Sequence, residues 1–196
     1  MPAFDFIAAI AAICATTVSA PQASNAAEYP YGRTATSLSG APLDDSTVIT
    51  LQRGPCFGDC PEYTVTVYGS GRVEFVGRRF VCAPGHRRAQ ASPDEVRSLV
   101  ERMLAFGYLD LYWRAGATSA ISPTVISSLS HGGRTQRIEH RLGDAKAPPL
   151  LTQFEKDIDA VAGSWRWLPE REDDRRVCRL SDGETKELLD LYIPTR

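Results

Sequence analysis

Two cysteines in a short turn constrain this chain more than any other feature. The turn reads Arg53-Gly-Pro-Cys-Phe-Gly-Asp-Cys-Pro-Glu-Tyr63 and lies between two strand-like runs. Cys56 and Cys60 are separated by three residues that include Gly58, so a compact turn brings their sulfur atoms within bonding range. This pattern is typical of a structural staple rather than of a catalytic centre.

Composition and charge narrow the class of protein. The chain has 196 residues, of which 43% are hydrophobic and 23% are charged, as in an ordinary globular protein with one principal domain. The formal net charge is −2. Nucleic-acid binding requires a strongly positive surface field, so we expect no nucleic-acid partner.

The N-terminus resembles a secretory signal peptide. An apolar run from Phe6 to Val18 is followed by small residues, and it is shorter than the roughly 20 apolar residues that span a bilayer. We expect a signal peptide over residues 1–26, a flexible leader over 27–45, and no transmembrane segment after cleavage. The alternative is a buried or frayed N-terminal helix, because the segment before the apolar run carries Asp5 and no Lys or Arg.

Hydrophobic periodicity predicts the elements that follow. Alternating apolar residues indicate strands, and apolar residues at helical spacing indicate two amphipathic helices. Ser92, Pro93 and Glu95 form a helix start in which Ser92 can cap, and glycines end both helices. The expected strands are 48–53, 63–68, 72–76, 125–129 and 134–139, and the expected helices run from 93 to about 107 and from 150 to about 163.

This order predicts an α+β domain over residues 46–163. We expect an antiparallel sheet of two hairpins plus an N-terminal strand, with both helices packed on one face. Residues 164–196 read as a charged C-terminal extension with a hint of a short strand and turn.

The cysteine turn also carries a family resemblance. The strand ending in Arg53, the Cys-Phe-Gly-Asp-Cys-Pro-Glu-Tyr63 turn and the following hairpin resemble domain of unknown function 6438, a bacterial family. The resemblance covers about residues 47–162. It implies this fold and an envelope location, and it implies no established activity.

The cysteines allow several readings. Removal of a signal peptide would also remove Cys14 and leave an even number of cysteines in an oxidising compartment, which favours disulfides. We expect two structural disulfides, with crossed pairing or a free Cys178 as alternatives. Cys56, Cys60, Cys82 and His86 also have the residue types of a Cys₃His zinc site, and a redox-active Cys56/Cys60 pair is a third reading. The disulfide candidates are Cys56, Cys60, Cys82 and Cys178.

Arginines give one region a local positive excess that could meet an anionic envelope ligand. The guanidinium fork binds carboxylates and phosphates bidentately. The alternative is a solvated rim of the first hairpin. The candidate residues are Arg53, Arg78, Arg79, Arg87 and Arg88. His86, His131 and His140 lie outside any known hydrolase motif, and we read each as a solvated or hydrogen-bonding residue.

Together these features predict an exported, periplasmic or secreted accessory domain of the bacterial cell envelope. We expect a monomer that binds or supports an envelope component, without intrinsic catalysis and without a cofactor. The alternative is a zinc-binding or thiol-redox protein centred on Cys56 and Cys60.

Overall fold

The structure is a computed structural model of the chain, and it describes residues 43–112, 122–172, 175–179 and 185–187. The expected signal peptide and nearly all of the expected leader lie outside the described residues. Within the described residues, no helix has the length and apolar character needed to cross a membrane.

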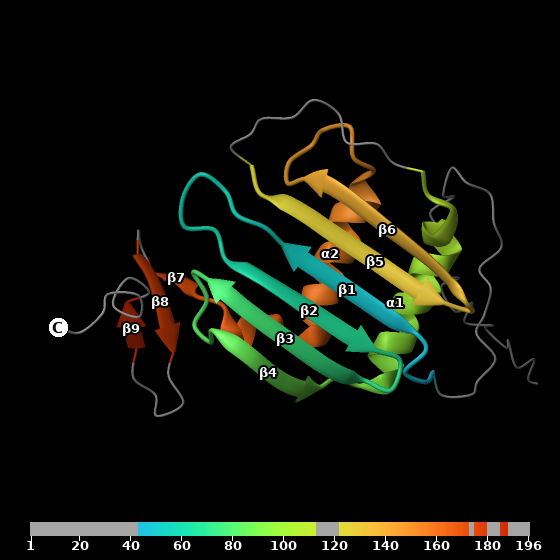
Figure 1. Cartoon of the computed structure of the whole chain (residues 1–196), viewed down its shortest axis with the longest axis horizontal. Helices are drawn as coiled ribbons and strands as arrows, with labels where there is room; N and C mark the ends of the chain where they lie inside the picture. The colour runs from blue at the N-terminus through green and yellow to red at the C-terminus, as the bar shows by residue number, and fades with distance from the viewer. Residues whose placement is uncertain (1–42, 113–121, 173–174, 180–184, 188–196) are drawn as a thin grey trace, which may run out of the picture. The chain divides into compact units, whose positions relative to one another are not determined.

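A six-stranded antiparallel sheet forms the body of the domain, with the strand order β4-β3-β2-β1-β5-β6 (Figure 1). The predicted α+β class and antiparallel sheet are confirmed, and the structure adds one strand, β4. The strands are β1 Val48–Arg53, β2 Glu62–Tyr68, β3 Arg72–Arg79, β4 Gly85–Gln90, β5 Thr124–His131 and β6 Arg134–Arg141.

One face of the sheet is buried and the other is half exposed, because successive side chains of a strand point to opposite faces. In β2, Tyr63, Val65 and Val67 are buried, whereas the threonines between them are only half-buried. The same alternation runs through β1, β3 and β5. The apolar residues of four strands therefore share one face.

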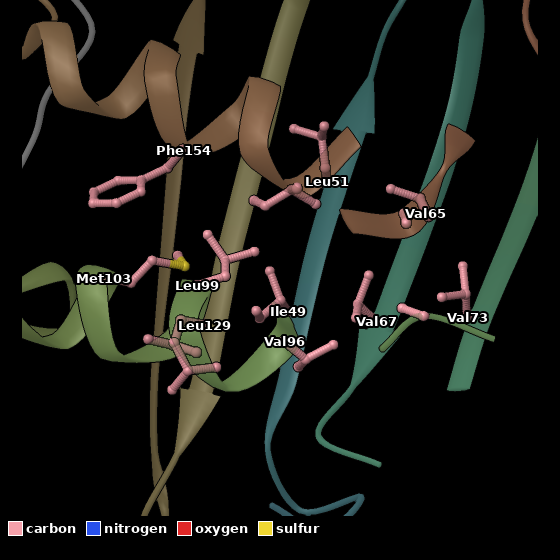
Figure 2. Packing of buried hydrophobic residues seen from close by; sticks show 14 of the residues in the cluster. Ile49, Leu51, Val65, Val67, Val73, Val96, Leu99, Met103, Leu129 and Phe154 are labelled. Carbon is pink, nitrogen blue, oxygen red and sulfur yellow. The ribbon is translucent and has the colours of Figure 1, made fainter. Parts of the chain in front are cut away.

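Two helices supply the other half of the core. They are α1 Pro93–Phe106 and α2 Pro149–Ala162, and Figure 1 draws both behind the sheet. Buried residues of both helices and of the sheet belong to one hydrophobic cluster. Figure 2 shows this packing, with Leu99 and Met103 of α1 and Phe154 of α2 beside Ile49 and Leu51 of β1.

The helix ends follow the sequence signals in part. Gly107 and Gly163 end α1 and α2 with φ of 82° and 61°, a left-handed conformation that glycine adopts without strain. Ser92 holds the position before α1, but its side chain makes no capping hydrogen bond. The start of α1 instead uses Pro93 and the bond from the Val96 N–H to the Ser92 carbonyl, at 3.1 Å.

Shorter elements follow each of the two helices. Two short 3₁₀ helices, η1 Tyr108–Asp110 and η2 Ser164–Trp167, follow α1 and α2 respectively. A small antiparallel sheet then forms from β7 Glu170–Glu172, β8 Arg175–Arg179 and β9 Thr185–Glu187.

Candidate functional site

The cysteine loop, residues 54–61, joins the end of β1 to the start of β2. Cys56 and Cys60 are bonded to each other, with their Cα atoms 5.7 Å apart. The Gly58 N–H donates to the Cys56 carbonyl at 3.0 Å, and Gly58 has φ of 146°. The loop leaves Phe57 91% exposed, so it presents an aromatic ring to solvent from a covalently closed turn.

A cluster of polar side chains lies where the two strands meet the cysteine loop. We call it the polar clamp, and it consists of Arg53, Tyr63, Asp159 and Ser164. The Arg53 Nη2 lies 2.8 Å from Asp159 Oδ2, and the Tyr63 hydroxyl donates to Asp159 Oδ1 at 2.8 Å. Ser164 Oγ donates to the same Oδ1 at 2.5 Å. The clamp therefore ties both strands that flank the cysteine loop to the end of α2.

The electrostatics of the clamp follow from its burial. Burial and the neighbouring Asp159 raise the pKa of the Tyr63 hydroxyl. Burial lowers the pKa of Arg53, but Tyr63 and Asp159 outweigh it, so the pKa of Arg53 is raised. Tyr63 is therefore a neutral hydrogen-bond donor and Arg53 a fixed cation at neutral pH. The arrangement satisfies a half-buried carboxylate and holds no activated nucleophile.

A second disulfide joins Cys82, which follows β3, to Cys178 of β8, across a sequence separation of 96. The Cys82 N–H donates to the Trp167 carbonyl at 2.8 Å, so Cys82 is held by a backbone hydrogen bond as well as by its disulfide. Cys178 is fully buried. This bond ties the small C-terminal sheet to the main domain.

The structure does not assemble the alternative zinc set. The sulfur atoms of Cys56 and Cys60 are bonded to each other, and that of Cys82 is bonded to Cys178. His86 is exposed on β4. In the part of the chain that the structure describes, no group of three or more His, Cys, Asp or Glu side chains is arranged to hold a metal ion.

The five candidate arginines fall into two groups. Arg53 lies in the polar clamp, and Arg79 lies 3.7 Å from Glu62 and over the ring of Phe80. Arg78, Arg87 and Arg88 are exposed at β3 and β4, and none pairs with a carboxylate among the described residues. Glu74, His86, Arg87 and Arg88 line a hollow of about 650 Å³. We call three neighbouring residues of β4, His86, Arg87 and Arg88, the basic edge.

A buried ion pair was missed at the sequence level. His140 of β6 and Glu155 of α2 are each 1% exposed, and His140 Nε2 contacts Glu155 Oε1. Burial lowers the pKa of His140, but Glu155 outweighs it, so the pKa of His140 is raised above 6.5. The signal was the position of Glu155, four residues after Leu151 on the apolar stripe of α2.

Tyr108 adds a second buried polar contact. Its hydroxyl lies 2.7 Å from Ser127 Oγ, and burial raises the pKa of Tyr108. His131 contacts Thr47 Oγ1 at 3.0 Å through Nδ1. His131 and His140 thus act as hydrogen-bonding residues of the fold, and His86 is solvent-exposed.

Comparison with known proteins assigns this architecture to a family. The model of the family described as domain of unknown function (DUF6438) matches residues 47–162, which include both strands beside the cysteine loop and Asp159 of the clamp. A search of curated proteins finds no match. The chain therefore belongs to the DUF6438 family.

Proposed function

We propose that this member of the DUF6438 family is an exported accessory domain of the bacterial cell envelope that binds or supports another component without catalysis. The observation that carries the proposal is the pair of disulfides, Cys56–Cys60 and Cys82–Cys178. Such bonds form and persist in oxidising compartments and are rare in the cytosol. An apolar run at the N-terminus, read as a signal peptide, supports the same location.

The polar groups with shifted pKa support a binding role over a catalytic one. Arg53 and Tyr63 are held by Asp159, and His140 is held by Glu155 inside the core. These pairs connect sheet to helix, so Arg53, Tyr63 and His140 are already engaged within the fold. Phe57 on the cysteine loop and the arginines of β4 are instead exposed, where another molecule can contact them.

The test is the location and thiol state of the protein in its bacterial host. We would fractionate the cells, then measure intact mass after iodoacetamide treatment with and without reductant. The proposal expects a periplasmic or secreted chain that has lost Cys14, with no alkylation before reduction and four alkylated cysteines after it. A full-length chain in the cytoplasm, alkylated without reductant, would contradict the proposal. A zinc-bound chain whose thiols react only after chelation would favour the metal reading instead.

A further inference from the structure

Strand β4 lies at one edge of the sheet and pairs only with β3 among the described strands (Figure 1). An edge strand presents unpaired backbone N–H and C=O groups that another extended chain can bond. Native proteins commonly block such edges, so the chemistry of β4 decides whether this edge can accept a partner.

The register shows which backbone groups of β4 are free. In an antiparallel pair, hydrogen-bonded residue pairs alternate with non-bonded pairs. The Ala91 N–H donates to the Gly71 carbonyl at 2.8 Å. Counting in steps of two along the register places Arg87 in a bonded pair with Phe75, so the backbone groups of His86 and Arg88 point away from β3. The contact of Arg87 Nη1 with the His86 carbonyl, at 2.8 Å, agrees with this direction.

The arginine side chains of this edge have no carboxylate partner. Arg87 and Arg88 are exposed, and neither forms an ion pair with a carboxylate in the described part of the chain. Glu74 lies directly opposite Arg88 on β3. Its carboxylate is already engaged by Arg72 Nη1 at 2.5 Å and by the Tyr68 hydroxyl at 3.3 Å.

The opposite edge of the sheet, β6, differs in this respect. Arg137 pairs with Glu139 at 3.1 Å, and Arg134 pairs with Asp110. Arg141, the third arginine of β6, is half-buried and donates to the Ser122 carbonyl at 2.8 Å, so each arginine of β6 has a partner within the fold. Of the two edge strands of this sheet, β4 is the one that carries exposed arginines without a carboxylate partner among the described residues.

Charge also selects the kind of partner. If two copies of this chain paired through β4, their arginines would face one another, and like charges directly opposite are destabilising. An extended acidic segment would instead place carboxylates beside Arg87 and Arg88 while its backbone bonds to β4. Arginine forks bind carboxylates bidentately.

We propose that the basic edge, His86, Arg87 and Arg88, is a docking site for an acidic segment of a partner protein that adds to the sheet as an extra strand beside β4. In this arrangement the backbone supplies the bonds of strand addition and the arginines select acidic sequences. Arg87 moves from the His86 carbonyl to a carboxylate of the incoming strand. The inference rests on the binding role proposed above and specifies the chemistry of the partner.

The test uses the oxidised mature chain and a fluorescein-labelled ten-residue peptide in which pairs of adjacent glutamates alternate with pairs of threonine and valine. Both faces of the extended peptide then carry carboxylates, because Arg87 and Arg88 point to opposite faces of β4. Two control peptides have glutamine in place of glutamate, or methyl groups on alternate backbone nitrogens. Fluorescence anisotropy should show binding of the acidic peptide and binding at least about tenfold weaker for both controls. On binding, the amides of His86, Arg88 and Gln90 should gain protection from hydrogen exchange.

Protein variants separate the edge from general charge. The double variant R87Q/R88Q should bind the peptide about tenfold more weakly, whereas the control R137Q on β6 should stay within about twofold. All three positions are exposed, so the fold should be unaffected.

Four results would overturn the inference. Equal binding of the methylated peptide would show an anion patch that also suits phosphate or a glycan. Equal weakening by R137Q would show unspecific charge attraction. Absence of any peptide binding would show that the arginines only prevent strand pairing at this edge. Self-association of R87Q/R88Q in the absence of peptide would show the same. Such failure in a chain exported with both disulfides intact would leave the proposed function standing, whereas a reduced cytoplasmic chain would overturn the proposed function itself.

Discussion

The half-buried side chain of Asp159 connects three elements of the fold. Its carboxylate accepts hydrogen bonds from Arg53 of β1, Tyr63 of β2 and Ser164 of η2. A half-buried carboxylate is costly unless hydrogen bonds replace its lost water, and here three side chains do so. The cysteine loop between β1 and β2 is thereby fixed at its base as well as closed by its disulfide.

Replacing Asp159 by Asn should therefore destabilise the protein. An amide NH₂ cannot accept from the donors that face it, so we expect a loss of about 1–3 kcal/mol in the free energy of unfolding. Urea denaturation followed by circular dichroism measures it. The control is Asp157→Asn on the same helix, which breaks a more exposed pair with Arg102 and should cost less than about 1 kcal/mol. Equal losses would remove the special role of the clamp.

His140 gives the fold a pH dependence whose sign follows from its raised pKa. The native state holds the proton that the unfolded chain releases near pH 6.5, so the ion pair with Glu155 stabilises fully below that pH. The stabilisation is lost as pH rises from 6.5 through the higher native pKa, by at most about 1.4 kcal/mol per pH unit.

Urea unfolding at a series of pH values from 5 to 9 tests this sign. Glu155→Gln is the comparison, because it keeps the size of the side chain and removes the charge that raises the pKa of His140. The difference in unfolding free energy between wild type and variant should shrink as pH increases above 6.5. A difference that stays constant or grows would show that His140 is neutral in the native protein.

At the scale of the elements, local sequence signals predicted those that bury an alternating or helical apolar stripe. The hairpins around Gly71 and Gly132–Gly133 and both helices belong to this class. Strand β4 escaped prediction because Gly85-His-Arg-Arg-Ala-Gln90 has no apolar alternation and every residue except Ala89 is exposed. Its strand conformation comes from pairing with β3, which a local pattern does not encode.

The same limit applies to the polar sites. Arg53 was grouped with the anion-binding arginines, because its partner Asp159 lies 106 residues further along the chain. Its role depends on how α2 packs against β1, which no local pattern reveals. The Cys56–Cys60 disulfide is predictable from local sequence, because the two cysteines are close in the chain and a short turn can bring their sulfur atoms within bonding distance.

The start of α1 yields a prediction at this scale. Ser92 makes no side-chain capping bond, so Ser92→Ala should change the unfolding free energy by less than about 0.5 kcal/mol, below the roughly 1 kcal/mol of a functioning cap. Gly107→Ala at the other end is the matched change. It should cost about 1 kcal/mol, because φ is 82° there and no neighbour lies within 4 Å of the new methyl group. Thermal denaturation compares both; a larger loss for Ser92→Ala would indicate a cap in solution.

At the scale of the whole molecule, the family region and the segment after it form a connected structure. The DUF6438 match ends at residue 162, yet Trp167 beyond it is 8% exposed and its ring lies 4.7 Å from that of Phe75 on β3. The Cys82–Cys178 bond then fastens β8 next to this contact. Trp167 and Cys178 are thus both in contact with the family region, although they lie beyond its end in the sequence.

The two disulfides should contribute unequally to stability. Chain entropy predicts about 2 kcal/mol for the short loop closed by Cys56–Cys60 and about 4.7 kcal/mol for a loop on the order of 100 residues such as that closed by Cys82–Cys178. Urea unfolding of the double alanine variants C56A/C60A and C82A/C178A compares these losses with the other disulfide intact. Reduction of the wild type supplies the combined loss as an upper reference.

We expect the C82A/C178A variant to lose at least twice as much stability as C56A/C60A, because its long loop gains the most freedom when unfolded. Equal losses would contradict the chain-entropy account, because the long loop would then constrain the unfolded chain no more than the short one.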